Sequence, residues 1–87
     1  MSPTSEEFTI QLDKLLSAAE ELGFSAIELS ASALHRRVGG YPGPDHRMPA
    51  CCGAMRKAMK PGDNVVRGPE KGAGASLVIR YALPSRL

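Results

Sequence analysis

Residues 39–62 read GGYPGPDHRMPACCGAMRKAMKPG, and this stretch decides how the chain is interpreted. Two adjacent cysteines, Cys51 and Cys52, follow a histidine and precede a basic segment. Cysteine and histidine in a short window are typical of zinc or redox sites. Free cysteine is also a small core hydrophobe, in which case the same residues belong to a helix with a basic outer face.

A helical projection of residues 46–60 favours the second interpretation. At 100° per residue, both cysteines fall on one apolar face among methionines, while the cations fall on the opposite side. The inward set is Met48, Cys51, Cys52, Met55, Ala58 and Met59, and the outward set is His46, Pro49, Ala50, Gly53, Arg56, Lys57 and Lys60. We therefore predict that the cysteines are core residues.

The spacing of the cysteines does not suit a metal or redox site. Paired zinc ligands are commonly two to four residues apart, and only His35 and His46 are present to complete a ligand set. Redox pairs usually have two residues between the thiols. We expect no metal and no cofactor.

The outer face of this predicted helix combines short side chains with long cationic ones. Gly53 inside a helix costs about 1 kcal/mol relative to alanine, so close approach of a large partner is one reason for it. Tight packing on another helix is the alternative, although the face is polar. A helix that enters the DNA major groove needs this mixture of access and positive charge.

The remaining segments predict a single small α+β domain. Apolar residues recur at three- and four-residue spacing near the N-terminus, and alternation near the C-terminus indicates a hairpin. Leu77, Ile79 and Tyr81 are expected on one face of its second strand, Ala75–Ala82. The predicted elements of the 1–87 domain are helix 4–22, strand 26–29, helix 30–38, loop 39–45, helix 46–60 and hairpin 63–83 with a glycine-rich loop at 67–75.

Charge is unevenly distributed along the 87 residues. Residues 1–29 hold one lysine against six acidic residues, and residues 30–87 hold ten basic residues against three acidic ones, giving net charges of −5 and +7. Such segregation favours binding an anionic surface in one orientation. The chain has no apolar run of membrane-spanning length, and its acidic N-terminus does not resemble a secretory signal, so we expect a cytoplasmic protein without membrane contact.

The order of these elements resembles the winged-helix variant of the helix-turn-helix family over residues 4–83. The resemblance implies that residues 46–60 are a recognition helix and residues 67–75 a wing, with Lys71 as the wing contact. The link between the second and third helices, about nine residues, is longer than in a compact helix-turn-helix, which adds Tyr41 to the candidates. The run GGYPGP-x-HRMP-x-CC is also similar to small modules that accompany HNH-type restriction nucleases.

The expected function is double-stranded DNA binding, in a regulatory role or one accessory to DNA metabolism. Lysines and arginines would neutralise phosphates, and Arg47 and Arg56 suit guanine because a guanidinium can bond two acceptors. The candidate contacts are Arg36, Arg37, Tyr41, His46, Arg47, Ala50, Gly53, Arg56, Lys57, Lys60, Arg67 and Lys71.

Other functions remain open at this point. A protein-interaction module, acting as a homodimer or as a subunit of a larger complex, would fit the same fold. RNA binding usually brings exposed aromatic residues, which are few here. The sequence shows no arrangement of residues typical of a catalytic triad. No acid follows Ser30, Ser32 and His35 to orient the imidazole, so we do not expect an enzyme.

Overall fold

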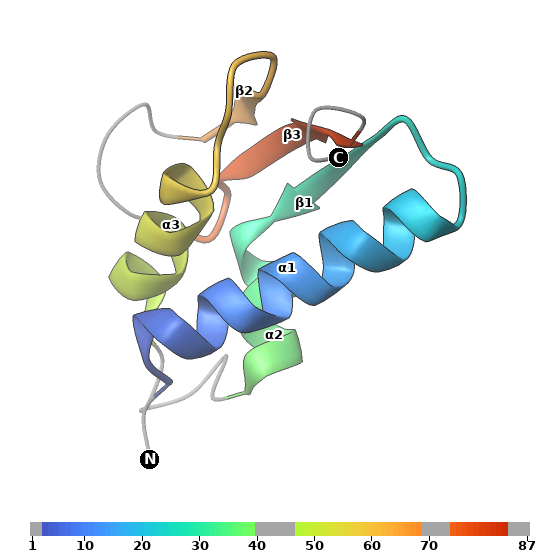
Figure 1. Cartoon of the computed structure of the whole chain (residues 1–87). Coiled ribbons are helices and arrows are strands. Elements are labelled where there is room, and N and C mark those ends of the chain that lie inside the picture. The colour runs from blue at the N-terminus through green and yellow to red at the C-terminus, as the bar shows by residue number, and fades with distance from the viewer. Residues whose placement is uncertain (1–2, 40–46, 69–73, 84–87) are drawn as a thin grey trace.

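Three helices cover one face of a three-stranded antiparallel sheet in the part of the chain that the structure describes (Figure 1). The structure is a computed structural model, and it describes residues 3–39, 47–68 and 74–83. This is the small α+β class that the sequence predicts. The elements are, in order, α1 (Ser5–Glu21), β1 (Ala26–Ser30), α2 (Ala31–Val38), α3 (Met48–Lys57), β2 (Asn64–Arg67) and β3 (Val78–Ala82).

Strand β3 is the centre of the sheet, with β1 on one side and β2 on the other. Its pairing with β1 runs from Ala26↔Ala82 to Ser30↔Val78. The predicted alternation is confirmed, because Leu77, Ile79 and Tyr81 are buried, Ser76 and Arg80 are exposed, and Val78 is half-buried. One face of the sheet therefore meets the helices and the other meets solvent.

Helix α1 is stabilised by a capping box at its N-terminus and by burial of an apolar stripe along its length. The side chain of Thr4 accepts a hydrogen bond from the backbone of Glu7, and the carboxylate of Glu7 accepts one from the backbone of Thr4, which completes a capping box. The inward stripe of Phe8, Leu12, Leu16 and Ala19 is buried. The predicted range 4–22 thus includes the two cap residues, Thr4 and Leu22.

Helix α3 is shorter than predicted, and this corrects the position of Lys60. The helix ends at Lys57, three residues before Lys60. Pro61 disfavours a helical conformation for the residue before it. The backbone N–H of Lys60 instead donates to Oδ2 of Asp63 at 2.9 Å, so a local turn replaces the last predicted helical residues.

Strand β3 also starts later than predicted. Ala75 and Ser76 form a turn, and the backbone N–H of Leu77 donates to the carbonyl of Gly74 at 3.1 Å. Because this hydrogen bond holds residues 74–77 in a turn, they cannot be extended, and the strand starts at Val78.

Both cysteines lie in the core, as predicted. Their exposed fractions are 0% for Cys51 and 1% for Cys52. The thiol of Cys51 donates to the carbonyl of Ala31 at 3.4 Å, and that of Cys52 to the carbonyl of Gly74 at 3.5 Å. Burial, followed by the neighbouring Cys52, raises the pKa of Cys51 to about 12, which keeps this thiol protonated near neutral pH.

We predict that Ellman's reagent at pH 8 reacts with neither cysteine of the native protein and with both in concentrated urea. The reagent requires an accessible thiolate, and these side chains are buried, with the pKa of Cys51 raised well above pH 8. Stoichiometric reaction of the native protein within seconds, measured by absorbance, would contradict the buried placement.

Candidate functional site

Helix α3 presents one uncovered stripe, which we call the α3 stripe: Pro49, Gly53 and Lys57. These residues are four apart, so they stack along one side of the helix, and all three are exposed. The opposite side is buried in the core and consists of Met48, Cys51, Cys52, Ala54 and Met55. The half-buried residues Ala50 and Arg56 flank the stripe.

The beginning of α3 is held by a buried histidine. The backbone N–H of Arg47, the N-cap residue, donates to Nε2 of His35 at 2.7 Å. His35 is completely buried, and its ring meets that of Phe8 edge-to-face with centroids 4.8 Å apart. One side chain therefore connects α1, α2 and α3.

The end of α3 is held by the central strand and the following turn. The phenol of Tyr81 donates to the carbonyl of Met55 at 2.8 Å, which gives a donor to one of the carbonyls that a helix leaves unsatisfied at its C-terminus. Asp63 then ties the turn to β3, because its Oδ1 accepts the N–H of Ala82 at 2.7 Å. These contacts fix the orientation of the α3 stripe relative to the sheet.

The structure distributes the predicted contact residues over more than one surface. Lys57 and Gly53 belong to the α3 stripe, with Ala50 beside it. The other exposed cations are at different places: Arg36 and Arg37 in the last turn of α2, Arg47 at the start of α3, and Arg67 at the end of β2. Tyr41, His46 and Lys71 lie outside the described residues.

Arg56 is a correction to the predicted outer face. It is half-buried, and its Nε is fully shielded from solvent. The reason is the width of the inward face of α3. Ala54 is also buried, although the projection did not include it among the inward residues, so the core contacts more of the helix than the sulfur-bearing side chains alone.

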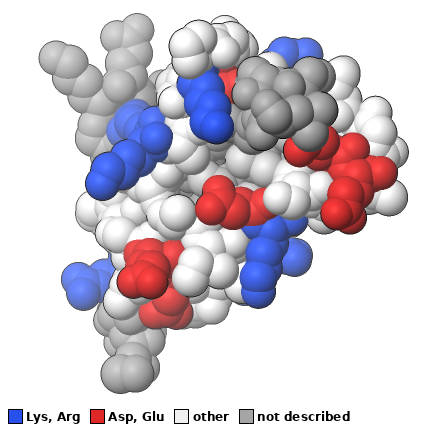
Figure 2. Space-filling model, in the orientation of Figure 1, with Lys and Arg blue, Asp and Glu red and all other residues white. Residues whose placement is uncertain are grey.

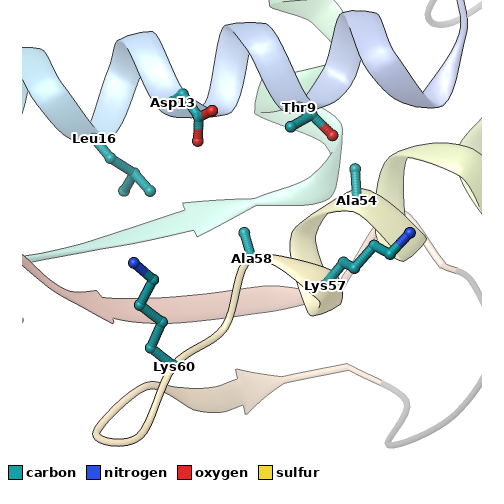
Figure 3. Close-up of a pocket in the computed structure, with 7 residues that line it drawn as sticks. All are labelled: Thr9, Asp13, Leu16, Ala54, Lys57, Ala58 and Lys60. Carbon is teal, nitrogen blue, oxygen red and sulfur yellow. The ribbon is translucent and has the colours of Figure 1, made fainter. Parts of the chain in front are cut away.

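A groove between α1 and the end of α3 is a feature that the sequence did not predict. It encloses about 280 Å³, and its walls are Thr9, Asp13, Leu16, Ala54, Lys57, Ala58 and Lys60. In Figure 3 the amine of Lys60 points toward α1, whereas that of Lys57 points away from Lys60. Lys60 therefore faces the α1 wall of the groove, which carries Asp13, instead of joining the α3 stripe. The polar residues Thr9 and Asp13, four residues apart on α1, are the feature of the sequence that could have indicated this groove.

Charge on the visible face follows the division seen in the sequence (Figure 2). Acidic side chains lie along α1 and gather at its C-terminal end, while basic ones lie mainly over α3 and the turn that follows it, with a further basic group below the middle of α1. In residues 3–39, 47–68 and 74–83, no three His, Cys, Asp or Glu residues are placed to hold a metal ion. No helix in these same segments is long and apolar enough to span a membrane.

Comparisons with protein-family models, with curated proteins and with solved structures find no match to this chain.

We predict that Tyr81→Phe lowers the free energy of unfolding by about 1–2 kcal/mol, because the buried Met55 carbonyl loses its donor while the ring remains. Urea unfolding followed by circular dichroism measures the change. An unaltered midpoint with an unaltered denaturant slope would show that this bond does not hold the end of α3.

Proposed function

We propose that this chain is a winged-helix domain that binds double-stranded DNA, with α3 as the recognition helix. The proposal is supported by the order of helices and strands and by the hairpin of β2 and β3 beside α3. In that assignment α3 enters the major groove and the segment between β2 and β3 acts as the wing. The role is regulatory or accessory to DNA metabolism.

Gly53 carries the proposal. It is exposed, its backbone does not need the left-handed conformation that glycine favours, and a Cβ added there would meet nothing within 4 Å. Packing on another helix of this chain, the alternative reason for a glycine, is therefore excluded among the described residues. The helix carries a cost of about 1 kcal/mol without a compensating internal contact. Close approach of a partner to the helix backbone would explain why a glycine is present at this position.

The charges around Gly53 favour DNA as that partner. Lys57 is on the same stripe, and Arg47 is exposed at the other end of the helix. Arg36 and Arg37 add two exposed guanidinium groups on α2. Cations that flank a small, uncovered helix face can neutralise phosphates while the helix approaches base edges. The acidic side chains of α1 would be repelled by phosphates, so they favour a docking orientation that leaves α1 away from the duplex.

We predict that Gly53→Gln weakens binding to duplex DNA at least tenfold, whereas Gly53→Ala weakens it only a few-fold. Both changes should raise the free energy of unfolding, by up to about 1 kcal/mol, because they improve helix propensity where there is open space. Fluorescence anisotropy with labelled DNA and urea unfolding give the two measurements.

Ala18→Gln is the matched control, since Ala18 is exposed on α1, and it should leave DNA binding unchanged. A Gly53→Gln variant that binds DNA as the wild type does would remove the argument that α3 approaches the duplex.

We predict that Lys57→Gln reduces the dependence of DNA affinity on salt. Loss of one phosphate contact lowers the slope of log K against log salt by about 0.9 for double-stranded DNA. Lys14→Gln, which removes the single lysine of α1 from the acidic surface, should not lower that slope. An affinity of the wild-type protein that barely changes between 50 mM and 200 mM salt would contradict the proposal.

A further inference from the structure

Two large apolar side chains project from the turn between α1 and β1. Leu22 is 77% exposed and Phe24 is 56% exposed, the highest values among the large hydrophobic residues of the described chain. They flank Gly23, and we call these three residues the apolar turn. In Figure 1 this turn lies at the opposite end of the molecule from α3.

Backbone hydrogen bonds fix the shape of the apolar turn. The N–H of Phe24 donates to the carbonyl of Ala19 at 3.1 Å, and the N–H of Gly23 to the carbonyl of Glu20 at 3.0 Å. With Gly23 at a φ of 90°, this is a Schellman motif. The apolar residue after such a glycine commonly packs back on its helix, but Phe24 stays more than half exposed. Both side chains are thus presented from a pre-organised backbone, which suits a binding anchor.

The charge that the end of α1 places beside the apolar turn is negative. The last turn of α1 contains Glu20 and Glu21 and no basic residue. The C-terminus of a helix is already its negative end, so carboxylates are unfavourable there and cations are favourable. Glu21 is exposed and directly precedes Leu22, whereas Glu20 is half-buried and lines a separate hollow together with Lys60. The end of α1 therefore combines exposed apolar surface with the exposed carboxylate of Glu21 and the negative end of the helix.

We infer that the apolar turn is a docking site for a protein segment that carries apolar side chains next to lysine or arginine. The apolar residues of such a segment would cover Leu22 and Phe24, and its cations would meet Glu21 and the helix C-terminus. A second copy of this chain is disfavoured, because two identical turns would bring like charges together. The distance from α3 lets this partner bind while α3 contacts another molecule, so the site extends the proposed DNA-binding role to recruitment of a protein.

A displayed library of random 12-residue peptides tests this inference directly. The native full-length chain is the target, and the double variant Leu22→Ser/Phe24→Ser is the counter-target. We expect enrichment of peptides with apolar residues beside lysine or arginine. A synthetic peptide of that consensus should bind the double variant at least tenfold more weakly, and the Glu21→Gln variant several-fold more weakly, by fluorescence anisotropy.

Ile10→Ser is the matched control, because Ile10 is a 45% exposed apolar residue elsewhere on α1, and it should bind the peptide normally. Circular dichroism establishes that each variant is folded, and Leu22→Ser alone replaces the double variant if that one is not. DNA affinity should not change in the Leu22 and Phe24 variants, which separates this inference from the proposed function.

Three results would overturn the inference. The first is a library that yields no peptide discriminating the native chain from the double variant, and the second is a consensus rich in acidic residues. The third is a homodimer, seen by light scattering after size exclusion, that Leu22→Ser/Phe24→Ser dissociates, because the turn would then be an interface between copies of this chain.

Discussion

Burial of one face of α3 is the constraint on which the rest of the structure depends. The helix has ten residues, Met48–Lys57, includes a glycine, and has an N-cap residue, Arg47, whose side chain makes no capping hydrogen bond. A helix so short is marginal in water by itself, so tertiary packing has to hold it. Met48, Cys51, Cys52 and Met55 provide that packing against α1, α2 and the sheet. Because they are inward, Pro49, Gly53 and Lys57 are outward.

The sequence predicted the elements whose signal is local and periodic. The apolar spacing of α1, the alternation of Leu77, Ile79 and Tyr81, and the sulfur-bearing face of α3 each repeat within a few residues, and all are confirmed. Boundaries were less predictable, because they depend on single competing bonds. Lys60 leaves the helix for the carboxylate of Asp63, a bond that no periodicity indicates.

Parts of the candidate site depend on residues that are far apart in the sequence, and here prediction failed. His35 follows the inward pattern of Ala31, Leu34 and Val38, so its burial could have been inferred, but its partner Arg47 is twelve residues away. That Asp13 and Lys60 line the same groove between α1 and the end of α3 likewise depends on how these elements pack. A helical projection gives directions around one axis and contains no information about a second helix.

The separation of charge along the chain becomes a separation of charge between surfaces once the helices are packed. α1 has a single lysine against five carboxylates, whereas α3 and the exposed end of α2 are basic. Because α1 lies beside α3, the two signs meet at the α1–α3 groove and diverge away from it. In the proposed function, an anionic duplex would approach the α3 side and be repelled from α1, which would leave the C-terminal end of α1 accessible. The same electrostatic asymmetry that would orient DNA would then leave Leu22 and Phe24 open to the cationic protein partner that we infer.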